Sequence, residues 1–462
     1  MIVACALFME NMDATVIATA LPSIARSFGE SPLRLSLAIT SYLLSLGVFL
    51  PLSGWLADRF GARSVFASAI VIFTAGSLAC SAAHSPSQLV LARVLQGVGG
   101  AMMVPVGRLV VLRAIPKPEL VSAMAWLTVP ALLGPVIGPP LGGFISTYYH
   151  WRWIFWINIP IGALGLLLAL RFVPDVREPQ RQRFDATGFA VVGVGLAATM
   201  LGFENVGRGV LSNAVVAALI GVGLLLLALY LRLEKRTQAP ILDLSLLRVH
   251  SFGASVCGGF VFRMGIGALP FLMPLLLQAG FGLTPFESGL ITCASAAGAL
   301  LMKLTAAPIL RRFGFRRVLL VNSVLCAAFM ASCSLFRPST PHLVIVLTLL
   351  TGGFFRSLHF TSLNTLAYAD VAPEAMSRAT TLAAVGQQLS LTFGVGTGAL
   401  ILHLTLMLRG ATELNADSFA PAYLVIAGLS LLSLFFFVPL SRDAGAELTT
   451  ARGAPAGAGS SA

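Results

Sequence analysis

Two ionisable side chains near the start of the chain have the types and positions for proton chemistry. Asp13 and Arg93 both lie inside long apolar segments, at comparable distances from the ends of those segments. An ionisable residue near the centre of a bilayer costs at least a few kcal/mol, so Asp13, Arg93, Glu10 and Arg108 are all functional candidates. An aspartate whose arginine neighbour can approach or recede can carry a proton or bind a cationic substrate, and Glu10 lies one turn away on the same helical face. The alternative is a static pair of Asp13 and Arg93 that joins two helices.

A second candidate site contains no titratable group. The segment GPVIGPPLGG repeats glycine and proline at helical spacing, which aligns each residue type on its own stripe. A bare glycine stripe lets another helix approach closely, and each proline removes a backbone hydrogen bond and bends the helix. Close packing alone would explain the spacing, and a functional role is the alternative. The residues concerned are Gly134, Pro135, Gly138, Pro139, Gly142 and Gly143.

The composition predicts which kind of element carries these residues. The chain has 462 residues, of which 57% are hydrophobic and only 10% are charged, whereas soluble domains carry about 25% charged residues. Because lipid offers no hydrogen-bond partner to the backbone, the recurring apolar runs must be helices. We therefore expect an all-α membrane protein with about fourteen transmembrane helices. They are expected near residues 2–22, 36–56, 65–83, 88–112, 120–145, 153–171, 186–204, 211–231, 253–278, 288–308, 317–336, 342–368, 378–406 and 419–440.

The basic residues predict the orientation of these helices. Lys and Arg, such as Arg113, Lys117 and Arg317, are concentrated in the connections on one side, which is expected to be cytoplasmic and to hold both termini. This asymmetry accounts for the net charge of +12 without a nucleic-acid partner. No basic residue precedes Arg26, which argues against a secretory signal peptide. The first apolar segment begins at the first methionine, so we expect the natural start to lie upstream.

Two longer charged connections, at 171–185 and 232–250, divide the chain. We expect two bundles of about six helices each, with about two inserted helices between them. The strings DRFGAR and RRFGFR follow corresponding helices of the two bundles and support an internal duplication, which is common in transporters. The predicted units are an N-terminal bundle (1–171), cytoplasmic linkers with the inserted helices (172–252), a C-terminal bundle (253–440) and a disordered cytoplasmic tail (441–462).

The first copy of this repeated turn is a candidate gate. Asp58 lies at a helix end with two arginines nearby, so it can join neighbouring helix ends through charge-assisted bonds that break when the bundles move. The alternative is an ordinary cytoplasmic turn. The gate candidates are Gly54, Asp58, Arg59, Gly61 and Arg63.

Four strings resemble motifs of the major facilitator superfamily. GWLADRFG (54–61) resembles its loop motif and RVLQGVGG (93–100) its span-4 motif. GPVIGPPLGG (134–143) is similar to the span-5 antiporter motif of its drug:proton exporters, and LFMENMDATVIATALP (7–22) to the span-1 motif of the fourteen-span drug:proton antiporter branch. The resemblance extends from about residue 5 to residue 440 and implies a two-bundle fold, alternating access and proton-driven export. It implies Asp13 as the proton or substrate carboxylate, Arg93 as its modulator and Asp58 as the gate.

The chain departs from the family pattern at the gate. The usual Arg-Lys after the loop glycine is replaced by Ala62-Arg63-Ser64, and the second copy of the turn has Arg311 where the first has Asp58. We therefore expect an asymmetric gate that is centred on the N-terminal bundle.

The C-terminal bundle raises the question of substrate charge. Its predicted helices contain cations but no carboxylate deep in a span, whereas a cavity for dicationic drugs needs acids there. We hypothesise a neutral, zwitterionic or anionic amphipathic substrate; alternatively, some of these cations extend to the membrane surface or interact with helix ends. The candidates for lining the substrate site are Arg263, Lys303, Arg356, His359, Asn364, Gln387 and Gln388.

These observations favour a proton-coupled exporter of small amphipathic molecules in the bacterial inner membrane. A dedicated metabolite or siderophore exporter of the same fold is the nearest alternative. An enzyme is not indicated, because the six histidines are dispersed and no nucleophile-base or metal-ligand cluster is evident. We expect no cofactor and no metal, with H+ as the coupling ion. The expected partners are the small-molecule substrate and the lipid bilayer, and no residue indicates whether a periplasmic adaptor protein also binds.

Overall fold

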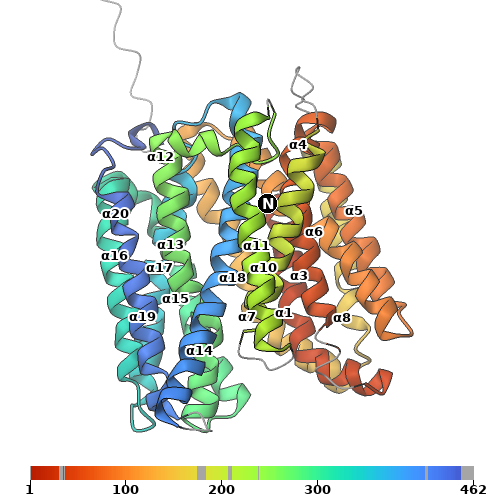
Figure 1. Cartoon of the computed structure of the whole chain (residues 1–462), viewed down its shortest axis with the longest axis vertical. Helices are drawn as coiled ribbons and strands as arrows, with labels where there is room; N and C mark the ends of the chain where they lie inside the picture. The colour runs from red at the N-terminus through yellow and green to blue at the C-terminus, as the bar shows by residue number, and fades with distance from the viewer. Residues whose placement is uncertain are drawn as a thin grey trace, which may run out of the picture.

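The chain folds almost entirely into α-helices that run roughly side by side (Figure 1). The computed structural model describes residues 2–30, 35, 37–173, 184–206, 211–237, 239–410 and 415–448, and these residues form no β-strand. Among them, 11 helices are long and apolar enough to cross a membrane, or up to 12 if a pair bent by 58° counts as one span. The chain is therefore a multi-pass membrane protein. Two further predicted spans, α1 (Ile2–Phe28) and α7 (Leu120–Tyr148), are not in this set.

The first group of helices packs around α6. Helix α6 contacts α3 and α5, α5 contacts α9, and α1 contacts α7 and α9. The predicted span 36–56 is broken at Pro51, after which the chain turns by 58° and continues as a helix to Phe60, because proline cannot donate the backbone hydrogen bond that would continue the helix. This N-terminal group consists of α1, α3 (Leu37–Phe49), α4 (Leu52–Phe60), α5 (Ala62–Ser81), α6 (Pro86–Ala114), α7, α8 (Trp153–Trp156) and α9 (Asn158–Phe172).

The second group is built from the C-terminal part of the chain. Helix α13 packs on α18 and α19, α17 packs on α15 and α16, and α16 also packs on α19. A continuous span from His250 to Gly280 includes two short π-helical segments. This C-terminal group consists of α12 (His250–Gly253), α13 (Gly259–Gly267), α14 (Leu269–Leu275), α15 (Pro285–Phe313), α16 (Phe315–Ser332), α17 (His342–Leu366), α18 (Met376–Arg409), α19 (Ala420–Leu432) and α20 (Leu434–Phe437).

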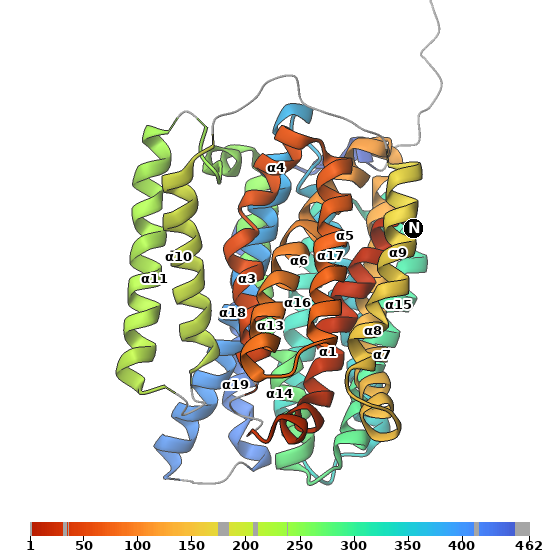
Figure 2. The same ribbon diagram turned by 90° about the vertical axis from the view of Figure 1, so that its right-hand side faces the viewer.

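Two helices lie beside both groups. Helices α10 (Ala186–Glu204) and α11 (Asn213–Leu233) form a pair at one side of the molecule (Figure 2). Helix α10 contacts α3 of the N-terminal group and α18 of the C-terminal group, whereas α11 packs mainly on α10. Leucines such as Leu225 on α11 are exposed, as expected for a surface that faces lipid.

The two groups meet along a few helix pairs. Helix α18 contacts α4 and α6, and α7 contacts α15 and α17. At the end of the molecule near Asp58, the loop between α6 and α7 also reaches the C-terminal segment, where Lys117 Nζ lies 2.7 Å from Glu447 Oε2. The hydrogen bond from Lys117 lowers the pKa of the Glu447 carboxyl group.

The start of the predicted disordered tail has a defined structure. Residues 441–448 form turns and a short 3-10 helix (Ala446–Leu448) that contacts the loop around Lys117. The expectation of disorder is corrected for this part of the tail, because Leu448 is buried and Glu447 is paired. Residues 449–462 lie outside the described residues.

Candidate functional site

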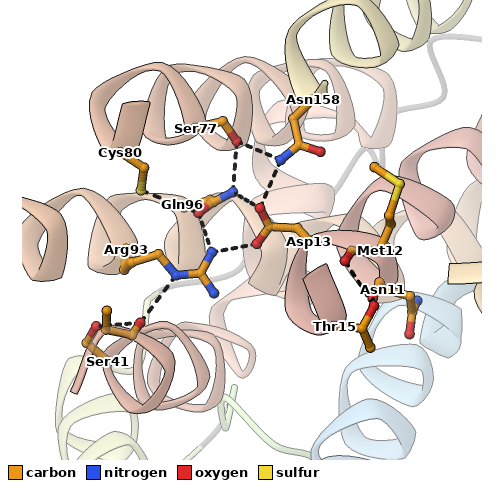
Figure 3. Close-up of polar contacts among 11 residues, drawn as sticks. Asn11, Met12, Asp13, Thr15, Ser41, Ser77, Cys80, Arg93, Gln96 and Asn158 are labelled. Atoms are coloured by element: carbon orange, nitrogen blue, oxygen red, sulfur yellow. Dashed lines mark hydrogen bonds and ion pairs between the residues drawn. The ribbon is translucent and has the colours of Figure 1, made fainter. Parts of the chain in front are cut away.

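Asp13 lies at the centre of a buried polar network inside the N-terminal group (Figure 3). Its Oδ2 is 2.5 Å from Arg93 Nη1, and its Oδ1 accepts hydrogen bonds from Gln96 Nε2 at 2.9 Å and Asn158 Nδ2 at 2.8 Å. Ser77 Oγ accepts from both amides, at 2.8 and 3.1 Å. Only 3% of Asp13 is exposed and Arg93 is fully buried, so both charges depend on these protein partners rather than on water.

Arg93 is held from several sides. Its Nε donates to the backbone oxygen of Ala38 at 3.2 Å, and its Nη1 donates to Gln96 Oε1 at 2.6 Å. The guanidinium group lies over the ring of Tyr42, with Cζ 4.3 Å from the ring centroid, which is a cation–π contact. The network therefore joins α3 and α6 as well as α1, α5 and α9.

The glycines that follow Arg93 explain how three helices fit around it. A Cβ atom on Gly97 would lie 2.7 Å from the backbone oxygen of Tyr42 on α3, and one on Gly99 would meet the backbone of Phe73 on α5. Neither Gly97 nor Gly99 could be replaced by alanine unless the backbone of a neighbouring helix moved. The string RVLQGVGG thus combines the ion-pair residue with the small residues that let α3 and α5 pack against α6.

Glu10 is close to this network but is not part of it. It is buried, and its Oε2 has no hydrogen-bond partner among the described residues. The hydroxyl group of Tyr42 is likewise buried without a partner among them. Because the Tyr42 ring contacts the Arg93 guanidinium group, its hydroxyl group lies in the same buried region as the network.

The glycine stripe of α7 packs against the helix that carries Asp13. A Cβ atom on Gly134 would lie 2.8 Å from the backbone nitrogen of Met12, and one on Gly138 would overlap the Thr15 side chain. Thr15 Oγ1 also donates to the backbone oxygen of Gly134 at 3.3 Å. These contacts lie on the face of α1 away from Asp13, so α7 packs against that face. Gly143, by contrast, has open space where a Cβ atom would be.

The remaining antiporter-motif residues lie on the same helix. Helix α7 continues from Leu120 to Tyr148 through Pro135, Pro139 and Gly142, so the prolines do not interrupt it. Gly142 is buried.

The gate candidates separate into two sets. Asp58 accepts a hydrogen bond from Ser377 at the start of α18 and pairs with Arg113 Nη2 at 3.5 Å. Gly54 permits the close approach of α4 to α18, because a Cβ atom there would lie 2.6 Å from Thr381 Oγ1. Arg59 is exposed, and Arg63 donates to the backbone oxygen of Leu170 within the N-terminal group. Contact across the two groups therefore involves Gly54 and Asp58, and not the two arginines.

The repeated turn has the same backbone shape in both copies. Gly61 between α4 and α5 has φ 87°, and Gly314 between α15 and α16 has φ 72°. Because L-residues with a side chain rarely adopt this region, glycine is required at both positions. The two turns therefore have a similar backbone, but the position of Asp58 in the first is occupied by the exposed Arg311 in the second.

The cations of the C-terminal group have neutral partners. Arg263 Nη2 donates to Asn364 Oδ1 at 3.1 Å, Lys303 Nζ donates to Thr361 Oγ1 at 2.9 Å, and Arg356 Nη2 donates to Ser295 Oγ at 2.8 Å. Among the described residues, none of these three cations forms an ion pair with a carboxylate.

The other predicted lining residues are dispersed. His359 is buried against Phe262, with ring centroids 3.6 Å apart, and neither ring nitrogen has a partner among the described residues. Arg356 lines a small cavity of about 40 Å³ within the C-terminal group. Gln387 Oε1 is buried without a partner in the described part of the chain, and Gln388 faces α3 and α10. The structure therefore does not bring all seven candidates into one pocket.

Sequence reasoning missed several residues of the network. Asn158 and Ser77 supply hydrogen bonds to it, and Tyr42 covers Arg93. Asn158 had a detectable signal, since it is a fully buried amide in an otherwise apolar segment. Ser77 and Tyr42 had none, because serine and tyrosine are common in transmembrane helices.

The comparison with known families agrees with this arrangement. The sequence profile of the Major Facilitator Superfamily matches residues 3–233 and 255–460. The chain belongs to the Major Facilitator Superfamily. It is therefore a transporter and not an enzyme, as predicted.

Relatives within the superfamily are similar over nearly the whole chain. A Klebsiella pneumoniae protein named "Putative multidrug resistance protein MdtD" is 39% identical over 457 residues, which covers 98% of this chain and 96% of the relative. A protein of the same name from Escherichia coli O6:H1 is 38% identical over 452 residues, with 96% and 94% coverage. These relatives support the predicted drug-antiporter branch of the superfamily.

Two solved structures share the fold. The human organic anion transporter MFSD10 has a TM-score of 0.68 and 16% identity, covering 94% of this chain and 98% of that one. The proton:xylose symporter XylE has a TM-score of 0.66 and 17% identity, with coverage of 95% and 94%. At these identities the likeness establishes the fold alone.

Proposed function

We propose that this transporter exports small amphipathic molecules, such as drugs or toxins, in exchange for protons that enter through Asp13. The observation that carries the proposal is the buried Asp13–Arg93 pair, 2.5 Å apart and covered by hydrogen bonds from Gln96 and Asn158. A carboxylate that loses its cation in low dielectric binds a proton more readily. Movement of α6 relative to α1 would therefore change the proton affinity of Asp13. The names of the relatives favour multidrug substrates, and a dedicated metabolite or siderophore exporter is the alternative.

The mechanism proposed is alternating access between the two helix groups, which correspond to the bundles 1–171 and 253–440. The helix pair between them, with its linkers, forms the unit 172–252. Asp58 and Gly54 contact α18 of the other group, so this arrangement corresponds to a state closed at this end. Opening would separate Asp58 from Ser377. The Asp58–Arg113 pair lies within the N-terminal group and would remain intact. In this proposal Asp58 and Gly54 form the gate, and Arg59, Gly61 and Arg63 shape the turn that carries it.

The membrane arrangement is also a proposal. Helices α1 and α7 contain 27 and 29 residues, which is more than the roughly 20 residues needed to span a bilayer. With them, the chain crosses the bacterial inner membrane about fourteen times. Both termini and the Asp58 end are then cytoplasmic, in accord with the basic residues of that end. The glycine stripe of α7 would exclude water next to α1 and limit proton leak.

The decisive experiment replaces Asp13. The measurement is proton release from energised inverted vesicles when a panel of charged and neutral compounds is added. We expect Asp13→Asn to abolish substrate-induced proton movement, because the amide cannot exchange a proton. Asp13→Glu, which keeps a carboxyl group, should retain part of the activity with a shifted pH profile. Asp417→Asn, which removes an exposed acid, is the matched control. Proton-coupled export that is unchanged in Asp13→Asn would remove Asp13 from the mechanism.

A further inference from the structure

Two arginines from different helix groups meet at the end of α17. Arg108 on α6 donates from Nη1 to the Tyr368 hydroxyl group at 3.3 Å, and Arg263 on α13 donates to Asn364 Oδ1 at 3.1 Å. Asn364 and Tyr368 are four positions apart, and Tyr368 N donates to Thr365 O at 3.3 Å, so the helical path continues to Tyr368. Residues with this spacing lie next to each other on one face. Arg108 from the N-terminal group and Arg263 from the C-terminal group therefore contact neighbouring residues of the same helical face.

Neither arginine has a negative partner among the described residues. Arg108 is 8% exposed and Arg263 is 5% exposed, and in the part of the chain that the structure describes neither forms an ion pair with a carboxylate. The Nε of Arg263 is buried without any acceptor there. Two like charges in a region of low dielectric repel each other, and a buried cation without a counter-charge is costly. An anion between the two arginines would relieve both costs.

The surroundings of Arg263 are built around its guanidinium group. A Cβ atom on Gly259 would lie 2.9 Å from Arg263 Nη1, so the glycine leaves room for this nitrogen. The ring of Phe360 lies beside the group, with its centroid 5.5 Å from Arg263 Cζ. Phe252 lies next to Tyr368, with ring centroids 6.4 Å apart. Two cations are thus bordered by aromatic rings, which suits an anionic group attached to an apolar body.

We propose that Arg108 and Arg263 together bind the anionic group of the transported substrate, an amphipathic carboxylate, sulfonate or phosphate. Guanidinium groups match the geometry of such oxyanions and form strong charge-assisted hydrogen bonds with them. The inference rests on the proposed function, because it takes the bound anion to be the transported substrate. It extends that function by assigning the substrate a negative charge. Asn364 and Tyr368 hold the two arginines in place until the anion replaces them as acceptors.

The site also links substrate binding to movement of the two groups. Arg108 belongs to the N-terminal group and Arg263 to the C-terminal group, so their repulsion opposes closure of the end near Asp58. An anion between them removes this repulsion and adds attraction to both sides. Loading with an anionic substrate therefore favours the closed state, whereas a cationic molecule of the same size does not.

The experiment uses compounds that share one aromatic body and differ in charge. The purified full-length transporter in lipid nanodiscs is titrated with 2-naphthoate, with the neutral 2-naphthamide and with the cationic 2-naphthylmethylammonium. The dissociation constant and the shift of the thermal midpoint are recorded. We expect 2-naphthoate to bind at least about tenfold more tightly than the other two, because only the carboxylate forms charge-assisted hydrogen bonds with the two arginines.

The variants separate an anion site from a purely structural pair. Arg108→Gln and Arg263→Gln should each weaken 2-naphthoate binding by at least about tenfold and leave 2-naphthamide binding unchanged. Arg108→Lys and Arg263→Lys should recover part of the affinity, because the charge remains. Arg312→Gln removes an exposed guanidinium group near the same end and should have no effect.

Three results would overturn the proposal: no binding of 2-naphthoate, equal binding of the three compounds, or unchanged 2-naphthoate affinity in both glutamine variants. Asp13→Asn distinguishes this proposal from the transport mechanism. That variant should bind 2-naphthoate like the wild type, even though its proton-coupled export is lost. If Asp13→Asn exports normally while the arginine variants lose anion binding, the proton mechanism is wrong and the anion site stands.

Discussion

Arg93 of the N-terminal group and the buried cations of the C-terminal group differ in the partners that they have. The N-terminal group places its fully buried arginine, Arg93, 2.5 Å from a carboxylate and surrounds both with amides. The C-terminal group buries Arg263 and Lys303 against neutral oxygens of Asn364 and Thr361. A buried ion pair that several hydrogen bonds support is stabilised locally, whereas the desolvation cost of a lone buried cation is not offset by a counter-charge. The first arrangement suits a proton site, and the second suits a site that awaits an anion.

This difference exists although the two groups share a repeated turn. Gly61 and Gly314 have similar positive φ values and connect corresponding helices. Only the first copy has an acid, Asp58, that reaches the other group, through Ser377. The two copies of the turn therefore agree in backbone geometry and differ in charge.

The largest effect is expected from breaking the buried pair. Arg93→Met leaves Asp13 buried without its cation, and loss of one partner of such a pair costs about 3–5 kcal/mol. The free energy of unfolding in mixed detergent and lipid micelles should fall by this amount. The double variant Asp13→Asn with Arg93→Met removes both charges, so it should lose less than the sum of the two single variants. A loss below about 1 kcal/mol for Arg93→Met would mean that the pair is not the stabilising element of the N-terminal group.

The opposite sign is expected in the C-terminal group. Lys303→Met has nearly the same length, removes a buried charge that has no carboxylate partner among the described residues, and gives up one hydrogen bond to Thr361. The lost bond contributes about 1 kcal/mol, and the desolvation cost that disappears is at least as large. The free energy of unfolding should therefore stay within about 1 kcal/mol of the wild type or rise. A decrease in the free energy of unfolding as large as that of Arg93→Met would mean that Lys303 has a counter-charge. The two groups would then not differ in how their buried cations are paired.

Much of the fold followed from the sequence because apolar length and period are local properties. The span predicted at 186–204 coincides with α10, and most others differ from the observed helices by a few residues. The span expected to end near residue 56 continues to Phe60 after a bend at Pro51. The break at Pro51 was not predicted, and the helical direction after it depends on packing against α5 and α18.

The candidate site was predictable only in part. Asp13 and Arg93 could be paired because the sequence places them at comparable depths in two predicted spans, and the structure brings them together. The contribution of Asn158 depends on how α9 is rotated against α1, which no local pattern specifies. The approach of Arg108 to Arg263 depends on how the two groups dock, so the predicted lining set included Arg263 and Asn364 without Arg108 or Tyr368.

An intermediate effect is expected for α7, the helix that packs on the face of α1 away from Asp13. In Gly138→Ala the new methyl group would overlap the Thr15 side chain and would lie 2.9 Å from its Cβ atom. Thr15 cannot rotate away freely, because its hydroxyl group already donates to backbone oxygens of α1. Relief requires α1 and α7 to separate, and such overpacking costs about 1–3 kcal/mol. The same unfolding assay measures this cost.

Gly143→Ala is the matched control for this substitution. It makes the same chemical change on the same helix, in a place with nothing within 4 Å of the new methyl group. Alanine is a better helix former than glycine by up to about 1 kcal/mol, so this variant should be neutral or slightly more stable. Because separation of α1 from α7 would move Asp13 relative to Arg93, Gly138→Ala should also shift the pH profile of export, while Gly143→Ala should leave it unchanged. Equal behaviour of the two variants would mean that the α1–α7 contact does not position Asp13, and the contrast between the two groups would then rest on Arg93 alone.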